Sequence, residues 1–150
     1  GAARGAAPGA GGVAWRRPDG LAEAMAEVRG LGAVRDLAQS FTRDLVQGKI
    51  LSAVMASGDV VEVTCSLSRN LDVFRVQIGR RHRELLMADF DNVLISGSGG
   101  GPHAESDELS AALALVSGEH LTFCFPDREA RDTFAMCFET FSRAAAVAAP

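Results

Sequence analysis

The sequence has no large excess of charge of one sign and no long hydrophobic run. Its 150 residues carry 15 lysines and arginines against 19 aspartates and glutamates, a formal net charge of −4. This balance argues against a general nucleic-acid binder, because such proteins are normally basic. No apolar run approaches the ~20 residues that a membrane-spanning helix needs. Hydrophobic residues still make up 47% of the chain, enough to bury the core of one domain.

Cysteine is scarce, and its placement excludes most cysteine chemistry. Cys65, Cys124 and Cys137 are an odd number and show neither metal-ligand nor redox spacing. Each lies in an apolar pattern, which predicts buried, reduced thiols and fits an intracellular, reducing compartment.

Catalytic and metal-binding motifs are also missing. The "GSGGG" at 97–101 lacks the Gly-Lys-Ser/Thr ending of a phosphate-binding loop, and no nucleophile elbow is present. The acidic "ESDEL" at 105–109 lacks the ligand spacing of a calcium loop. The histidines His82, His103 and His120 are scattered over turns and a loop without metal-ligand spacing. We therefore expect a protein without enzymatic activity, metal or cofactor.

The chain divides into three segments by composition and periodicity. Residues 1–18 are rich in glycine and alanine and have no period, which predicts a flexible leader that contains the single tryptophan, Trp15. Residues 19–48 show helical spacing and predict helices over 20–29 and 33–47, separated by the "GLG" at 30–32. Residues 49–145 are predicted to form the main domain.

The helix predicted over 33–47 carries an apolar stripe of Leu37, Phe41 and Leu45. Two interpretations follow: the stripe packs onto the domain, or it docks a protein partner or a second copy of the chain. Packing is the commoner use of such a stripe, and we favour it.

After Gly48 the apolar period changes to two, which predicts about seven short strands joined as hairpins. The "SGD" at 57–59 predicts a tight turn, and the "GRRHRE" at 79–84 predicts a basic turn. Asp127 is a natural N-cap for a last helix, whose aromatic face would close the open end of the sheet. The predicted fold is mainly β with α: a seven-stranded antiparallel barrel or sandwich capped by a C-terminal helix, with an extra N-terminal helix.

Seven strands closed by one helix resemble the pleckstrin-homology (PH) superfold, most closely in "EHLTFCFPDREARDTFAMCFETFSRA" at 119–144. Three stretches within 49–141 are more specifically similar to the apicomplexan inner membrane complex sub-compartment proteins: "KILSAVMASGDVVEVTCSLS", "VQIGRRHRELLMADF" and "LTFCFPDREARDTFAMCF". The resemblance implies a divergent PH-like domain at an inner membrane complex, peripheral attachment through N-terminal myristate and palmitate, and a link to cell division. The chain itself shows no acylation motif, since Gly1 is followed by "AARG" and no cysteine precedes Cys65.

Lipid-binding PH domains hold inositol phosphates with several cations on the first hairpin, because clustered phosphates need converging charged donors. Residues 49–67 offer only Lys49, against Asp59 and Glu62. The remaining basic cluster is Arg80, Arg81, His82 and Arg83. Lys49 and the three arginines of this cluster are candidates for an anionic lipid or phosphate site. The alternative interpretation is that the cluster is a charged turn exposed to solvent.

The favoured function is therefore a non-catalytic PH-like interaction or scaffold module of a membrane-associated protein. It would lack the usual phosphoinositide-binding residues and act through protein–protein contacts, without nucleic acid. The alternative is a module that binds phosphoinositides or anionic membranes through the Arg80–Arg83 segment. An enzyme would need a convergent polar pocket with perturbed titrating groups.

Overall fold

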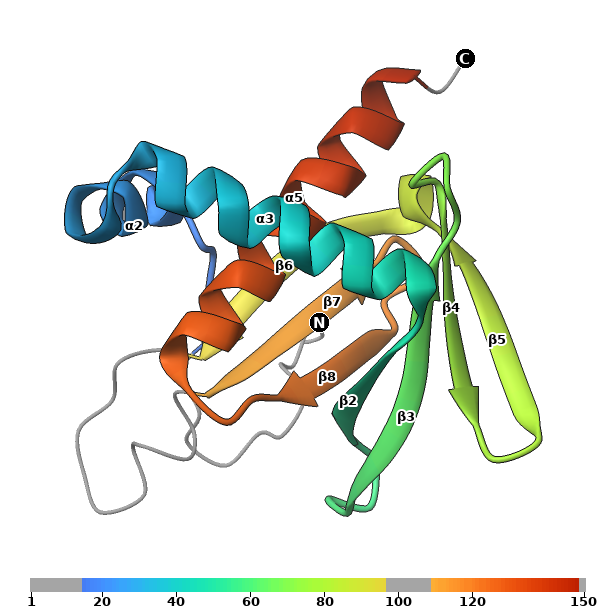
Figure 1. Cartoon of the computed structure of the whole chain (residues 1–150). Helices are drawn as coiled ribbons and strands as arrows, with labels where there is room; N and C mark the ends of the chain where they lie inside the picture. Colours follow the sequence, from blue (N-terminus) through green and yellow to red (C-terminus); the bar gives the residue numbers. More distant parts are fainter. Residues whose placement is uncertain (1–14, 97–108, 149–150) are drawn as a thin grey trace.

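The structure is a computed structural model that describes residues 15–96 and 109–148 (Figure 1). The predicted loop at 97–101, His103 and residues 105–108 of the acidic stretch lie outside the described residues. In chain order, the elements are β1 (Trp15–Arg16), α2 (Leu21–Arg29), α3 (Leu31–Gln47), β2 (Lys49–Val54), β3 (Val60–Leu67), β4 (Val73–Ile78), β5 (Arg81–Leu86), the 3-10 turn η1 (Met87–Asp89), β6 (Phe90–Ser96), β7 (Ser110–Leu115), β8 (His120–Cys124) and α5 (Arg128–Ala148).

The strands form one antiparallel sheet in the order β1-β6-β7-β8-β2-β3-β4-β5. The sheet curls into a half-barrel, with β2 to β5 turned away from the plane of β6 to β8 (Figure 1). The predicted mainly β architecture with a C-terminal helix and N-terminal helices is confirmed. The described sheet has one strand more than predicted, because Trp15 and Arg16, which the sequence places in the leader, pair with Ser96 and Ile95.

The segment predicted as a basic turn is mostly a strand. Only Gly79 and Arg80 turn the chain, and Gly79 takes the left-handed φ of 60° that such a turn favours. Residues 81–86 pair one by one with 73–78 of β4. The strand forms despite its charge because Leu85 lies opposite Phe74 in the core, while the arginines reach solvent beyond it. The prediction of a turn over 79–84 was therefore wrong for 81–84, where charged residues continue the strand to the tip of the hairpin.

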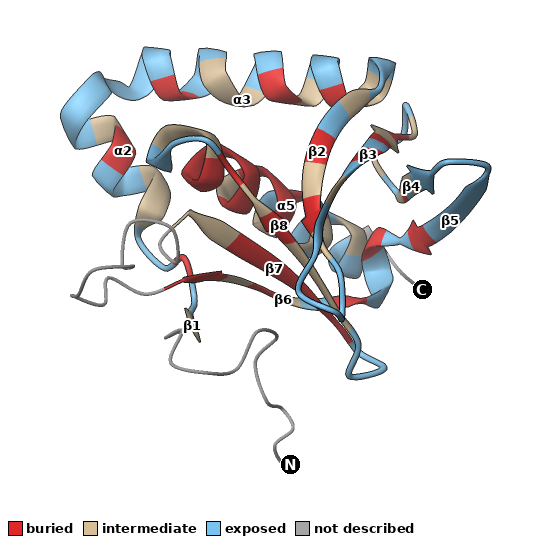
Figure 2. Cartoon of the chain, turned by 90° about the horizontal axis from the view of Figure 1, so that it is seen from below, coloured by how far each residue is buried: buried red, intermediate tan, exposed pale blue. Residues whose placement is uncertain are grey.

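Helix α5 closes the core as expected from its aromatic stripe. Asp127 caps it, since its Oδ1 accepts the Ala130 N–H at 2.8 Å. The rings of Phe134 and Phe138 stack with centroids 4.5 Å apart, and Phe138 meets Phe74 of the sheet edge-on at 4.9 Å. Figure 2 shows the buried face of α5 against the strands.

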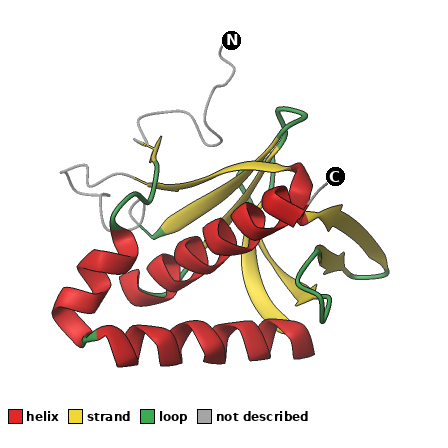
Figure 3. Ribbon diagram, turned by 90° about the horizontal axis from the view of Figure 1, so that it is seen from above, coloured by secondary structure: helices red, strands yellow, loops and turns green. Residues whose placement is uncertain are grey.

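Helices α2 and α3 are separate, because Gly30 at φ 90°, ψ 149° interrupts the helical backbone between them. Helix α3 then runs alongside α5 (Figure 3). Phe41 is 8% exposed and Leu45 is fully buried, and the Phe41 ring meets Phe134 edge-on at 6.1 Å. Of the two interpretations of the apolar stripe, packing onto the domain is the one that the structure shows.

All three cysteines are free thiols. Cys65 and Cys137 are buried as predicted, and burial raises the pKa of each to about 12. Cys124 is only half-buried, although burial raises the pKa of its thiol as well.

A thiol reagent is therefore expected to distinguish the three cysteines. At pH 8 in the folded protein, Ellman's reagent should modify Cys124 first, since thiolate formation and access both control the rate. Cys65 and Cys137 should react only once the protein unfolds. Mass spectrometry of the modified peptides checks this order, and early labelling of Cys65 would contradict the described packing of β3.

Candidate functional site

A hollow of roughly 650 Å³ opens at one end of the half-barrel, and we call it the mouth. It lies between the end of β2, the β4–β5 hairpin and the segment 119–123, which covers all of β8 except its last residue. Its volume is that of a small-ligand site. The residues that line it are mostly apolar: Ala53, Val54, Met55, Ala56, Val76, Ile78, Arg81, His82, Arg83, Leu85, Glu119, His120, Leu121, Thr122 and Phe123.

Strand alternation sets which side chains face the mouth. Phe74 pairs with Leu85 at the buried end, then Val76 pairs with Arg83, and Ile78 pairs with Arg81 at the tip. Paired residues share a face of the sheet, so Arg81 and Arg83 stand on the same face as the buried Leu85. The mouth therefore has an apolar base and two arginines near its rim.

Arg83 is already paired. Its Nη1 and Nη2 donate to the two carboxylate oxygens of Glu119, in the turn before β8. The hydrogen bonds from Arg83 hold the pKa of the Glu119 carboxyl below its usual range, and those same bonds raise the pKa of Arg83. Glu119 thus stays ionised at neutral pH, and the fork of the guanidinium faces the carboxylate instead of a phosphate.

The other predicted site residues are only partly brought together. Arg80 lies in the β4–β5 turn, and Arg81 lies at the rim of the mouth, both exposed. Lys49 begins β2, about 20 Å of strand away from the turn that follows Val54, at about 3.3 Å per residue. It lines a different hollow, which contains none of the three arginines. The predicted grouping of Lys49 with Arg80, Arg81 and Arg83 is therefore corrected: Arg81 and Arg83 line the mouth, Arg80 lies in the adjacent turn, and Lys49 lies apart from all three.

The predicted docking residues are also placed differently. Phe41 and Leu45 belong to the core, and only Leu37 of the stripe is partly exposed. These three residues do not form an open docking surface, because α3 turns two of them toward α5 and the sheet.

Sequence reasoning missed Glu119. It lies 36 residues from Arg83, and nothing in the local "SGEH" turn distinguishes it from a solvated acid. The pair forms only because the half-barrel brings the β7–β8 turn opposite β5.

Within the described ranges, no group of three or more His, Cys, Asp or Glu side chains is arranged to hold a metal ion. None of the described helices combines the length and hydropathy needed to cross a bilayer.

Two solved structures from Toxoplasma gondii share this architecture. Inner Membrane Complex Sub-compartment Protein 3 superposes with a TM-score of 0.58, at 16% identity, over 76% of this chain and 86% of that one. Inner Membrane Complex Sub-compartment Protein 1 gives a TM-score of 0.59, at 14% identity, over 72% of this chain and 92% of that one. This chain has the fold of the sub-compartment proteins.

The structural match agrees with the resemblance in the sequence, and at these identities it concerns the fold alone. No protein-family model matches the chain, and no curated protein matches it in sequence. The fold of the sub-compartment proteins is thus established by structure rather than by sequence identity.

Proposed function

We propose that this chain is a non-catalytic interaction module of a membrane-associated protein at an inner membrane complex, and that it works through protein contacts. The fold shared with two sub-compartment proteins supports this setting. Peripheral attachment in this proposal comes from N-terminal acylation, as the resemblance implies, and a link to cell division belongs to the same proposal.

The pairing of Arg83 with Glu119 is the observation that carries the proposal. A phosphoinositide head group needs several charged donors that converge from fixed backbone. Here one of the two inward arginines is neutralised by a carboxylate at the mouth, and the lysine of β2 lies at the other end of its strand. Of the two arginines that line the mouth, only Arg81 is therefore left to donate to a phosphate without first breaking the pair with Glu119.

Exposed apolar side chains support a role in protein contacts. Val28 is 84% exposed and Leu31 is 64% exposed, on either side of the bend at Gly30 between α2 and α3. Neighbouring exposed apolar residues of this kind are typical of interaction surfaces.

A second candidate function is weak attraction to anionic membranes through Arg80 and Arg81. Neither side chain forms an ion pair or hydrogen bond with the residues that the structure describes. Each cation near an anionic surface contributes about 1 kcal/mol. Arg80 and Arg81 could therefore attract the chain to an anionic membrane, although they do not converge on one point as the donors of a head-group site do.

Substitution of Glu119→Gln tests the proposal. The change removes one negative charge and releases Arg83, so we expect about a fivefold gain in binding to phosphoinositide-containing vesicles, since each freed cation adds about 1 kcal/mol. Co-sedimentation at low and at physiological salt measures the effect, and the gain should shrink with salt because these charges are exposed.

Glu84→Gln is the matched control. Glu84 is next to Arg83 on β5, and its carboxylate lies 3.7 Å from Arg75, so Glu84→Gln makes the same charge change close to Arg83 without freeing it. The expected gain for Glu84→Gln is well below that for Glu119→Gln. Strong binding of the unmodified chain, abolished when Arg80, Arg81 and Arg83 are changed to Glu, would instead favour the lipid-binding alternative.

A further inference from the structure

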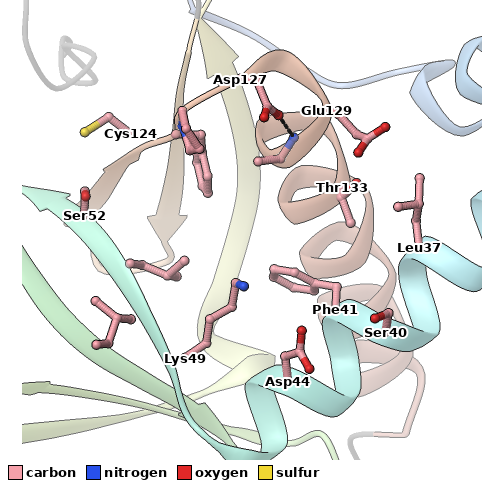
Figure 4. A pocket seen from close by; sticks show the side chains of 15 residues that line it. Leu37, Ser40, Phe41, Asp44, Lys49, Ser52, Cys124, Asp127, Glu129 and Thr133 are labelled. Atoms are coloured by element: carbon pink, nitrogen blue, oxygen red, sulfur yellow. Dashed lines mark hydrogen bonds between the residues drawn. The ribbon is translucent and has the colours of Figure 1, made fainter.

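A second hollow, of roughly 380 Å³, lies between α3, the start of β2 and the junction of β8 with α5. We call it the α3 groove. Its base is apolar and includes Phe41, Leu51 and Phe125. In Figure 4 the Lys49 side chain reaches into the groove beside the Phe41 ring.

One wall of the groove is a strand edge without a partner. β2 pairs with β3 along its whole length, but it pairs with β8 only over 52–54. If the register continued, Ile50 would lie opposite Pro126, which has no N–H to donate and leads the chain into α5. The groove side of residues 49–51 is therefore left without a strand neighbour among the described residues.

The opposite wall contains an unsatisfied polar group. Thr133 on α5 is 6% exposed, and its Oγ1 has no hydrogen-bond partner within the described part of the chain. Buried hydroxyls are nearly always bonded, so an orphan needs an explanation. Threonine on a helix populates two χ1 rotamers, and a change of rotamer can offer the hydroxyl to an occupant of the groove.

The rim of the groove is acidic overall. Among the described residues that line it, Asp44, Asp127 and Glu129 are acidic and Lys49 is the one cation. Glu129 is paired with Arg29, and Asp127 caps α5, whereas Asp44 forms no ion pair or hydrogen bond with the described residues. An approaching segment therefore meets an open carboxylate next to an apolar base.

We infer that the α3 groove binds an extended segment of another protein that carries an apolar side chain beside a basic one. The segment continues the sheet along 49–51, sets its apolar side chain over Phe41 and places its basic residue near Asp44. Strand addition supplies backbone hydrogen bonds, and the pocket selects the side chain. This inference rests on the proposed role in protein contacts and names the surface and the chemistry of the partner.

The test uses a display library of random twelve-residue peptides, selected on the chain as it exists. We expect the selected peptides to share an apolar residue next to Lys or Arg. A synthetic copy should slow hydrogen exchange of the amides at 49–51. The inference would be overturned if no peptide is enriched or if the consensus is acidic. It would also be overturned if the peptide protects only amides on another surface.

Three variants sharpen the test. Asp44→Lys should weaken binding of the synthetic peptide at least tenfold, and it suits the last turn of α3, where cations are favourable. Asp36→Lys, on the same helix outside the groove, should leave binding unchanged. Thr133→Val should weaken binding severalfold without lowering the melting temperature, because it removes a hydroxyl that has no hydrogen-bond partner among the described residues. Equal binding by Asp44→Lys and Asp36→Lys would contradict the assignment.

The outcome is separable from that of the vesicle experiment, which probes the mouth. If no peptide binds the α3 groove while the Glu119→Gln result holds, only the groove assignment falls. If the unmodified chain binds phosphoinositide vesicles tightly through its arginines, the proposed function falls whatever the peptides do.

Discussion

Phe138→Ala is expected to lower the free energy of unfolding by about 3–5 kcal/mol, the usual cost of truncating a buried phenylalanine. The Phe138 ring is fully buried, and it joins α5 to both the sheet and α3. Its centroid lies 4.9 Å from that of Phe74, 4.5 Å from that of Phe134 and 6.5 Å from that of Phe41. The truncation removes one member of each pair and leaves a cavity where three elements meet.

Urea unfolding followed by circular dichroism measures the change. Val147→Ala is the control on the same helix, since Val147 is 83% exposed and exposed substitutions usually change stability by less than about 0.5 kcal/mol. A cost below about 1 kcal/mol for Phe138→Ala would mean that α5 does not close the core as described.

Asp132→Asn is expected to destabilise the fold by about 3 kcal/mol, because it neutralises a buried carboxylate that accepts two charged hydrogen bonds from the buried Arg131 guanidinium. Arg131 is 3% exposed and Asp132 is 8% exposed. The Nε and Nη2 of Arg131 donate to Asp132 Oδ1 at 2.9 and 2.7 Å, and its Nη1 donates to the Ser96 carbonyl at 3.4 Å. This network ties the first turns of α5 to the end of β6.

The control is Glu139→Gln, which removes an i, i+4 pair with the exposed Arg143 on the same helix. Such surface pairs contribute about 0.3–0.5 kcal/mol, so the two substitutions should differ severalfold in thermal and urea unfolding. Equal costs would show that the Arg131–Asp132 pair is solvated rather than buried.

The sequence correctly predicted the features that depend only on residues close together in the chain, such as strand alternation and helix capping. The alternation in β3 places Val63, Cys65 and Leu67 in the core, because strand geometry alone decides which residues share a face. Asp127 caps α5 because a cap depends only on its next three residues.

Long-range features could not be predicted in the same way. Trp15 forms a strand only because Ser96, far along the chain, lies at an unpaired edge. Arg83 looks like a free cation in the sequence, and its neutralisation depends on the curl of the sheet that brings Glu119 to it. The separation of Lys49 from the arginines likewise follows from the length of β2, with Lys49 at its far end.

The α3 groove also depends on long-range packing that the sequence does not reveal. The sequence marks Pro126 as the end of a strand, but it does not reveal that the groove side of β2 then has no strand neighbour over 49–51 among the described residues, while β3 pairs with the other side. It also gives no sign that the Thr133 hydroxyl is buried without a hydrogen-bond partner in the described part of the chain, because that depends on how α3 packs over α5.

Because Glu119 already occupies the Arg83 guanidinium, we expect that the mouth does not recognise a phosphoinositide head group. Isothermal titration of the unmodified chain with soluble inositol 1,4,5-trisphosphate at physiological ionic strength measures head-group binding by itself, without any contribution from a membrane surface. We expect no saturable binding into the millimolar range. Micromolar binding that disappears when Arg81 and Arg83 are changed to Glu would contradict it, and would show that the Arg83–Glu119 pair opens to admit phosphate.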